Sequence, residues 1–255
     1  MKDSIITSKK RIYTLLSLIF WLLVWEVASL LINVELYLPS PFSTFKALFN
    51  MIFESNFWII VFTSISRVII GFLISCILGI SLGILCGINN FLYSLWQPFI
   101  VAIKSTPVMS FIIIALVWFK SDNVPIFICC LMCLPIIWTA TIAGINQVDN
   151  RLLEMSKLFS VSKKNVITGI YFHSITPYIS SAMITALGLG WKVTVAAEVL
   201  SSPRNSIGIK LLNAKVYLES AELFAWTIVV IILSMIFEYL FKYIISKATK
   251  FKGIK

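Results

Sequence analysis

Charged residues inside long apolar stretches are the first candidates for chemistry in this sequence. Arg67, Lys104, Lys192 and Glu198 each lie within or at the edge of such a stretch. Charges at the depth of a bilayer are costly, so they are usually paired or functional. Lys192 and Glu198 lie about 9 Å apart along an ideal helix and about 120° around it, which does not favour an ion pair between them. Lys192 therefore either lines a path that attracts an anionic solute or pairs with a neighbouring helix, whereas Arg67 and Lys104 are long enough to reach an interface.

The thiols and the single histidine form no set that predicts catalysis or metal binding. The five cysteines all lie in apolar stretches, without His or carboxylate neighbours in sequence: Cys76, Cys86, Cys129, Cys130 and Cys133. We interpret them as small packing residues rather than as a redox or metal motif. For His173 we expect a surface or capping role. The sequence predicts no metal site, no catalytic residue and no cofactor on this chain.

The elements that must position these residues are membrane spans. Of the 255 residues, 59% are hydrophobic and 13% are charged, with a mean hydropathy of +0.96, a charged fraction well below that of soluble domains. The net charge of +10 lies between and beyond apolar runs, which favours anionic lipid over nucleic acid as a partner. We expect an all-α integral membrane protein, a single transmembrane domain over residues 1–255, with about six spans: roughly residues 12–31, 58–88, 98–119, 124–145, 175–200 and 223–245.

Basic residues predict the orientation of these spans. Thirteen of the 21 Lys and Arg residues lie in the termini and in the loop after the fourth span, against five in the opposite loops. Because cytoplasmic loops are enriched in Lys and Arg, both termini and the 146–174 loop are predicted to be cytoplasmic. The second span carries small residues every four positions, which predicts close helix packing: Gly71, Ser75, Gly79, Gly83 and Gly87.

The predicted cytoplasmic loop contains a short amphipathic segment at about residues 150–172. Its apolar residues recur at helical spacing, with Arg151, Glu154 and Lys157 on the opposite face. Asn150 is a candidate cap at its start, and residues 160–162 (Ser-Val-Ser) are expected to break the helix. From periodicity alone, such a helix either lies on the membrane or inserts its apolar edge into a protein groove.

The loop resembles the coupling-helix motif of ABC importer permeases, which reads Glu-Ala-Ala, three residues, Gly, nine residues, then Ile-x-Leu-Pro. Glu154 and Ile170 match this pattern, whereas Ser160 stands at the Gly position and His173 at the Pro position. Further segments resemble permeases of the sulfonate, taurine, nitrate and thiamine-precursor type, in the correct order over about residues 25–245: Trp25-Glu26, Leu38-Pro39-Ser40-Pro41, residues 66–72, Pro98, Pro107, Trp118-Phe119 and residues 190–198.

The resemblance implies a homodimer in a bacterial inner membrane, two ABC ATPase subunits beneath it and an extracytoplasmic substrate-binding protein. ATP would be bound by the partner, since the chain has no Gly-x4-Gly-Lys-Ser/Thr loop to hold its phosphates. The implied ATPase-coupling residues are Leu153, Glu154, Met155, Lys157, Leu158, Phe159 and Ser160. Lys192, Glu198 and Lys104 are the candidates for a translocation path, which would carry a small organic solute or nutrient, with an organic anion as the hypothesis.

Three other classes of membrane protein also have several apolar spans. A secondary, ion-gradient-driven transporter would usually show more spans or an internal repeat, and the halves of this sequence show no convincing one. A membrane enzyme would require clustered His, Cys or paired carboxylates at one depth. A vitamin importer component of another fold would also carry cytoplasmic docking helices, and the segment at residues 191–198 is what argues against it.

Overall fold

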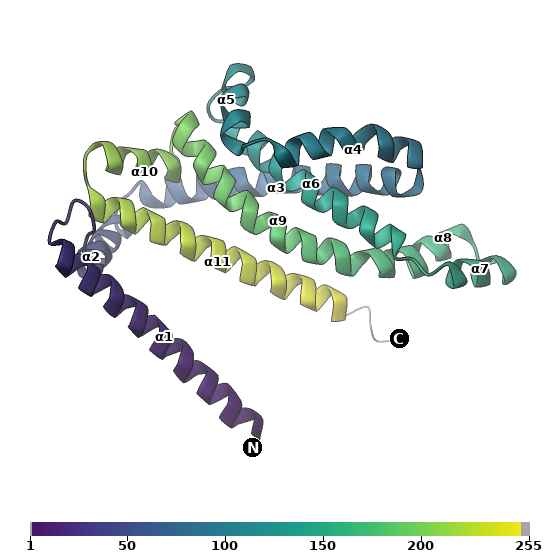
Figure 1. Cartoon of the computed structure of the whole chain (residues 1–255), viewed down its shortest axis with the longest axis horizontal. Coiled ribbons are helices and arrows are strands. Elements are labelled where there is room, and N and C mark those ends of the chain that lie inside the picture. The colour runs from purple at the N-terminus through teal and green to yellow at the C-terminus, as the bar shows by residue number, and fades with distance from the viewer. Residues whose placement is uncertain (1, 251–255) are drawn as a thin grey trace. The chain divides into compact units, whose positions relative to one another are not determined.

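The computed structural model describes residues 2–250, and these are helical almost throughout (Figure 1). The contacts divide the chain into two compact units, Met1–Ile59 with Lys210–Ile231, and Ile60–Ile209 with Ile232–Lys255. Each unit is described by itself. The prediction of a single transmembrane domain stays a prediction.

The helices follow one another with short connections. In chain order they are α1 (Lys2–Ile32), α2 (Pro41–Ile52), α3 (Phe57–Ile88), α4 (Asn90–Ser105), α5 (Val108–Trp118), α6 (Val124–Asn146), α7 (Asn150–Leu158), α8 (Lys163–Val166), η1 (Ile167–Tyr171), α9 (Phe172–Ser201), α10 (Ile207–Val216) and α11 (Ser220–Lys250). Five of the described helical segments are long and apolar enough to cross a membrane, or six if the bent pair α4–α5 forms one span. The expected all-helical membrane architecture is thus confirmed.

The predicted third span differs from the structure. Residues 98–119 were expected to form one helix, but α4 and α5 meet at an angle of 106°. The break lies at Thr106, whose backbone is extended at φ −83° and ψ 135°, followed by Pro107. Proline disfavours a helical conformation in the residue before it and has no N–H to donate. The sequence signal for the bend was therefore Pro107, which the hydropathy pattern hid.

The first unit is held together by aromatic side chains and by caps around the α1–α2 connection. The Trp25 indole N–H donates to the Pro39 carbonyl at 3.0 Å, and the Ser29 hydroxyl donates to the Leu38 carbonyl at 3.0 Å. The Ser40 hydroxyl accepts from the backbone N–H of Ser43 and so caps α2. On α11, the buried Trp226 stacks on Phe57 with ring centroids 5.3 Å apart.

The second unit is built on the packing of α3, α6 and α9. Figure 1 shows α6 and α9 side by side, and this pair has the most extensive contact in the chain. A Cβ atom added at Gly71, Gly79 or Gly83 would lie within 3 Å of a side-chain atom of α6. The predicted packing role of the small residues is confirmed, because only a residue without a Cβ lets α6 approach α3 so closely.

Two of the cysteines lie where these three helices meet. Cys129 and Cys133 are fully buried, and their thiols donate to the backbone carbonyls of Val68 on α3 and Ala186 on α9. A Cβ atom at Gly190 would come within 3.0 Å of both sulfur atoms. These two thiols therefore act as small packing groups that also satisfy backbone carbonyls between helices.

Candidate functional site

The α7 turn, defined here as residues 149–162, begins with a side-chain cap. The Asp149 carboxylate accepts a hydrogen bond from the backbone N–H of Arg151 at 2.8 Å, and α7 starts at Asn150. The expectation that Asn150 caps the helix was wrong by one residue. The Asp149 carboxylate also interacts favourably with the positive end of the helix dipole.

The end of α7 is fixed by a left-handed residue. Ser160 has a φ of 49°, the N–H of Ser160 donates to the Lys157 carbonyl, and the N–H of Val161 donates to the Ser156 carbonyl. This pair of bonds is the Schellman arrangement, which favours glycine at the left-handed position. The geometry therefore explains the glycine of the coupling-helix pattern, and Ser160 adopts the same conformation at some energetic cost. The predicted helix break at residues 160–162 is confirmed.

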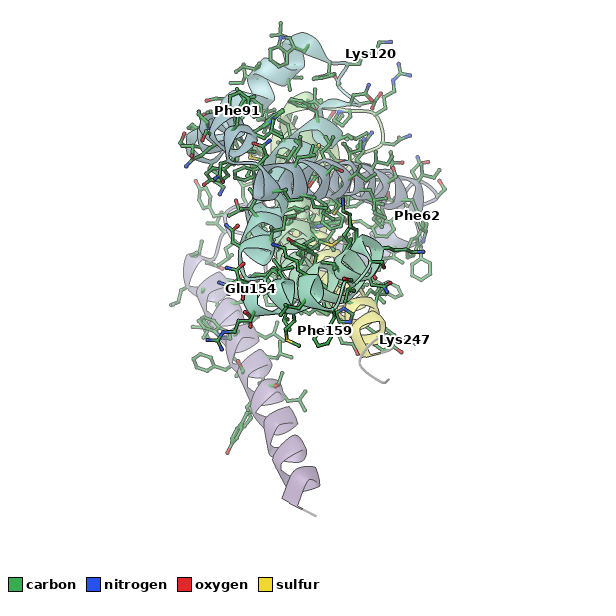
Figure 2. The ribbon with its side chains drawn as sticks, turned by 90° about the vertical axis from the view of Figure 1, so that its right-hand side faces the viewer. Phe62, Phe91, Lys120, Glu154, Phe159 and Lys247 are labelled. Carbon is green, nitrogen blue, oxygen red and sulfur yellow. The ribbon has the colours of Figure 1, made fainter. Side chains whose placement is uncertain are left out.

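The α7 turn presents apolar side chains that this chain does not cover. Leu158 is 81% exposed and Phe159 is 75% exposed, and Leu152 and Met155 are also exposed, whereas Leu153 is half-buried. Glu154 and Lys157 are exposed beside them. Figure 2 looks onto the end of the chain that carries α7, where it labels Glu154 and Phe159. Among the apolar side chains of the predicted ATPase-coupling residues, Leu158 and Phe159 are the most exposed and Leu153 is the least exposed.

A continuous helical path leads from the α7 turn to α9. The Ser162 hydroxyl caps α8 by accepting from the backbone N–H of Asn165. The segment Lys163–Ser201 then runs as one helical stretch through the π-helical turn η1. Figure 1 shows α7 and α8 beyond the ends of α6 and α9. A force applied at the α7 turn would thus act directly on a buried helix of the second unit.

The intramembrane charges Arg67 and Glu198 form a buried ion pair, with side chains 6% and 0% exposed. One guanidinium nitrogen of Arg67 donates to the Glu198 carboxylate at 3.0 Å, and the other donates to Asp122 at 3.1 Å and to the Arg204 carbonyl at 2.9 Å. Arg67 does not extend to a membrane interface, although its side chain is long enough to do so. Instead it joins α3 to α9 and to the loops at residues 119–123 and 202–206.

The second oxygen of Glu198 anchors the start of α10. It accepts from the Ser64 hydroxyl at 2.9 Å and from the backbone N–H of Gly208 at 3.1 Å. The Ser64 hydroxyl in turn accepts from the N–H of Ile207 at 3.0 Å. We call this set of groups (Ser64, Arg67, Asp122, Glu198 and the backbone of residues 204–208) the Arg67 network. Its polar groups satisfy one another, as buried polar groups must.

The three predicted path residues are therefore in different surroundings. Glu198 is enclosed in the Arg67 network and offers no exposed surface, which argues against contact with a moving solute. Lys192 is exposed on α9. Lys104 is exposed at the end of α4, and its ammonium group donates to the Thr139 hydroxyl at 2.8 Å. The ion pair of Glu198 with Arg67 was not predicted from the sequence, where the alternative of an ion pair with a neighbouring helix was raised for Lys192.

Outside the spans, one carboxyl group in the first unit has a shifted pKa. A hydrogen bond with Glu222 and the repulsion between the two carboxylates raise the pKa of Glu219, while the Lys210 charge opposes the shift. Both glutamates border a recess that also contains Glu35. No Lys, Arg or His lines this recess. The positive charge that acts on Glu219 comes from Lys210, which is not a lining residue.

The family model described as a binding-protein-dependent transport system inner membrane component matches residues 79–250. The chain belongs to this family. The match includes the α7 turn, α9 and all of α11, and it identifies the chain as a permease subunit of an ABC importer rather than a secondary transporter.

Curated relatives agree with the family assignment. The nitrate import permease protein NrtB of Synechocystis is 29% identical over 208 residues, which are 77% of this chain and 74% of that protein. The taurine transport system permease protein TauC of Escherichia coli is 21% identical over 220 residues, 84% of this chain and 80% of the relative. The bicarbonate transport system permease protein CmpB of Synechococcus elongatus is 29% identical over 152 residues, 59% and 55% of the two chains.

Proposed function

We propose that this permease forms a homodimer that carries a small organic anion across a bacterial inner membrane. Two ABC ATPase subunits bind its α7 turns, and an extracytoplasmic binding protein delivers the solute. Both termini and the α7 turn lie in the cytoplasm. The excess of Lys and Arg in the termini and in residues 146–174 supports this orientation.

The exposed apolar rim of the α7 turn carries the proposal. Leu158 and Phe159 are large, exposed and held in place by the Schellman bonds on either side of Ser160. A rigid apolar edge flanked by Glu154 and Lys157 has the composition of a helix that inserts into a protein groove. A helix that lies on an anionic membrane favours a polar face rich in Lys and Arg, whereas the polar face of α7 carries Glu154 between Arg151 and Lys157.

Coupling would follow from the helical connection. Closure of the ATPase pair on ATP would displace the α7 turn, and the segment Lys163–Ser201 would transmit that displacement to α9. Because packed helices respond as rigid bodies, such a displacement produces rocking between two openings. No residue of α7 then needs to perform chemistry.

The anionic character of the solute is supported by the relatives and by the two accessible lysines. The relatives are named for nitrate, bicarbonate and taurine; the first two solutes are anions and the third has a sulfonate group. Lys104 and Lys192 supply positive charge on exposed surfaces of helices α4 and α9.

The test is isolation of the chain from its native membrane in mild detergent, followed by native mass spectrometry. We expect a complex with two copies of this chain and two copies of a protein that contains a phosphate-binding loop. A complex with one copy of this chain and one copy of a different permease would contradict the homodimer. Isolation of this chain with no ATPase, from membranes that retain ATP-driven uptake, would contradict the proposed docking.

A further inference from the structure

A cavity of about 710 Å³, broadly open on one side, lies in the second unit between the end of α4, the second half of α6 and the first half of α9. Five of its lining residues are polar, namely Lys104, Thr139, Tyr178, Ser181 and Thr185, and five are apolar. Its volume falls within the range of binding sites for small organic molecules.

The only charged lining residue is Lys104, and the lining includes no Asp or Glu. The Lys104 ammonium donates to Thr139 at 2.8 Å, while the Thr139 hydroxyl donates its own proton to the Pro135 carbonyl at 2.7 Å. This bond fixes the ammonium group at the cavity wall and uses one of its three N–H donors. The cavity therefore has a positioned positive charge with donors remaining for an anion.

Hydroxyl groups of α9 extend the polar wall. Tyr178, Ser181 and Thr185 line the cavity at spacings of three and four residues, which places them on one face of the helix. The Thr185 hydroxyl donates to the Ser181 carbonyl at 3.2 Å, so the hydroxyls of Tyr178 and Ser181 are the ones that can donate to an acidic group beside the lysine. The rest of the wall is apolar: Ile136, Ala140, Ala143, Pro177 and Ala182.

The size and the apolar wall distinguish between classes of anion. A nitrate or bicarbonate ion takes up a volume comparable to one or two water molecules, about 30 Å³ each, so it would leave most of this cavity unfilled. An organic anion places its acidic group at Lys104 and its carbon skeleton against the alanines and Ile136. Burial of that skeleton adds about 25 cal/mol per Å² of apolar surface.

We propose that this cavity is a solute-binding subsite for an organic anion, such as a sulfonate or carboxylate with a short carbon chain, and that Lys104, positioned by Thr139, binds its acidic group. This inference rests on the proposed function, because it names the substrate class of the path. It excludes Glu198 from the subsite, and it assigns the binding of the acidic group to Lys104 rather than to Lys192, which does not line the cavity.

The experiment measures binding to the full chain in nanodiscs of phosphatidylcholine, with butane-1-sulfonate and sodium nitrate as probes at equal ionic strength. Thermal unfolding of the chain reports binding, since a ligand that binds only the folded state raises its midpoint. We expect a saturable rise with butane-1-sulfonate and none with nitrate. Lys104→Gln should weaken binding about tenfold or more, because it removes charge-assisted hydrogen bonds, and Lys104→Arg should restore much of it.

Two further variants separate the site from general effects of charge and folding. Lys120→Gln removes the same charge from an exposed loop of the same unit and should leave the affinity unchanged. Ala140→Phe should weaken binding, because the larger side chain occupies the apolar wall where the carbon skeleton would lie while Lys104 is intact. Equal sulfonate affinity in the parent chain and in Lys104→Gln, or a larger response to nitrate than to sulfonate, would overturn the proposal.

The acidic group could also belong to a lipid, and a second set of nanodiscs containing phosphatidylglycerol distinguishes the two sources. Lys104-dependent stabilisation by this lipid, with no response to sulfonate in either nanodisc, would overturn the solute subsite. The readout needs no ATPase, so a negative result here leaves the docking of the α7 turn untouched. Conversely, sulfonate binding with no recoverable ATPase would refute only the proposed partner.

Discussion

The Arg67 network and the α7 turn both contain a glutamate close to a basic residue, but in opposite surroundings. Glu198 is 0% exposed, and both of its oxygens accept hydrogen bonds from within the chain. Glu154 is exposed, next to apolar side chains that the chain leaves uncovered. A charged residue in a permease helix therefore stabilises the fold where all its hydrogen-bonding partners lie within the chain, as for Glu198. It is available to a partner protein where the apolar side chains beside it are uncovered, as for Glu154.

The two regions therefore differ in what a mutation would change. In the Arg67 network a substitution lowers the free energy of unfolding, because removal of one partner leaves the other charge buried and unpaired. In the α7 turn the same kind of substitution alters a surface, where stability changes are usually within about 0.5 kcal/mol. Mutations in the first region should change the amount of folded protein, and those in the second should change its association.

The largest effect is expected for Arg67→Met. The variant leaves Glu198 buried without its cation and should lose about 3–5 kcal/mol of stability, seen as a lower midpoint in heating followed by size-exclusion chromatography. The double variant Arg67→Met/Glu198→Met should recover part of the loss, because both charges are gone. If Arg67→Met proved as stable as the parent chain, the Arg67 network would not stabilise the fold.

Gly208→Ala tests the same network through its backbone. A Cβ atom at this position would lie 2.4 Å from the Cβ of Glu198 and 2.5 Å from the nitrogen of Val199, so we expect a loss of about 1–3 kcal/mol from overpacking. Gly188→Ala is the matched control, because a Cβ there meets nothing within 4 Å. Equal unfolding midpoints for the two alanine variants would contradict the close packing of Gly208 against Glu198.

Substitution of Ser160 should have a smaller, local effect. Ser160→Gly removes the cost of a left-handed non-glycine residue, about 1 kcal/mol, and should slow hydrogen exchange at the Val161 amide. Ser160→Val should accelerate exchange there, since a β-branched residue tolerates a φ of 49° poorly. Indistinguishable exchange rates in the two variants would contradict the Schellman geometry.

The smallest effect on folding is expected for Leu158→Asn. Its side chain is 81% exposed, so the free energy of unfolding should change by less than about 0.5 kcal/mol. The same variant should weaken association with the ATPase, measured by the amount that co-purifies at equal permease levels. A loss of stability as large as that of Gly208→Ala would mean that Leu158 is covered by this chain.

Features that depend on one helix could be predicted from the sequence. Hydropathy placed the spans that became α1, α3, α6, α9 and α11, and the four-residue spacing of Gly71, Gly79 and Gly83 predicted the contact that α3 makes with α6. Amphipathic periodicity found α7, and the Ser-Val-Ser sequence marked its end. Hydropathy, helical periodicity and residue spacing are properties of one segment, so the sequence of that segment is enough to predict them.

Features that join distant segments could not be predicted in the same way. Arg67 and Glu198 are 131 residues apart, and helical geometry excluded only the pairing of Glu198 with Lys192. A buried carboxylate in one span and a buried guanidinium in another were a signal for a pair, but nothing in the sequence fixed their depths. The Lys104 cavity likewise depends on three helices, and the bend at Pro107 was concealed by uninterrupted apolar composition.

The most direct test of the central claim compares two phenylalanines of similar exposure. Phe159 in the α7 turn is 75% exposed and Phe91 on α4 is 73% exposed, and Figure 2 labels both. In the complete importer isolated from its native membrane, Phe159→Glu should abolish recovery of the ATPase while Phe91→Glu preserves it, with both permeases equally folded. Full recovery of the ATPase with Phe159→Glu would show that the α7 turn is not its docking site.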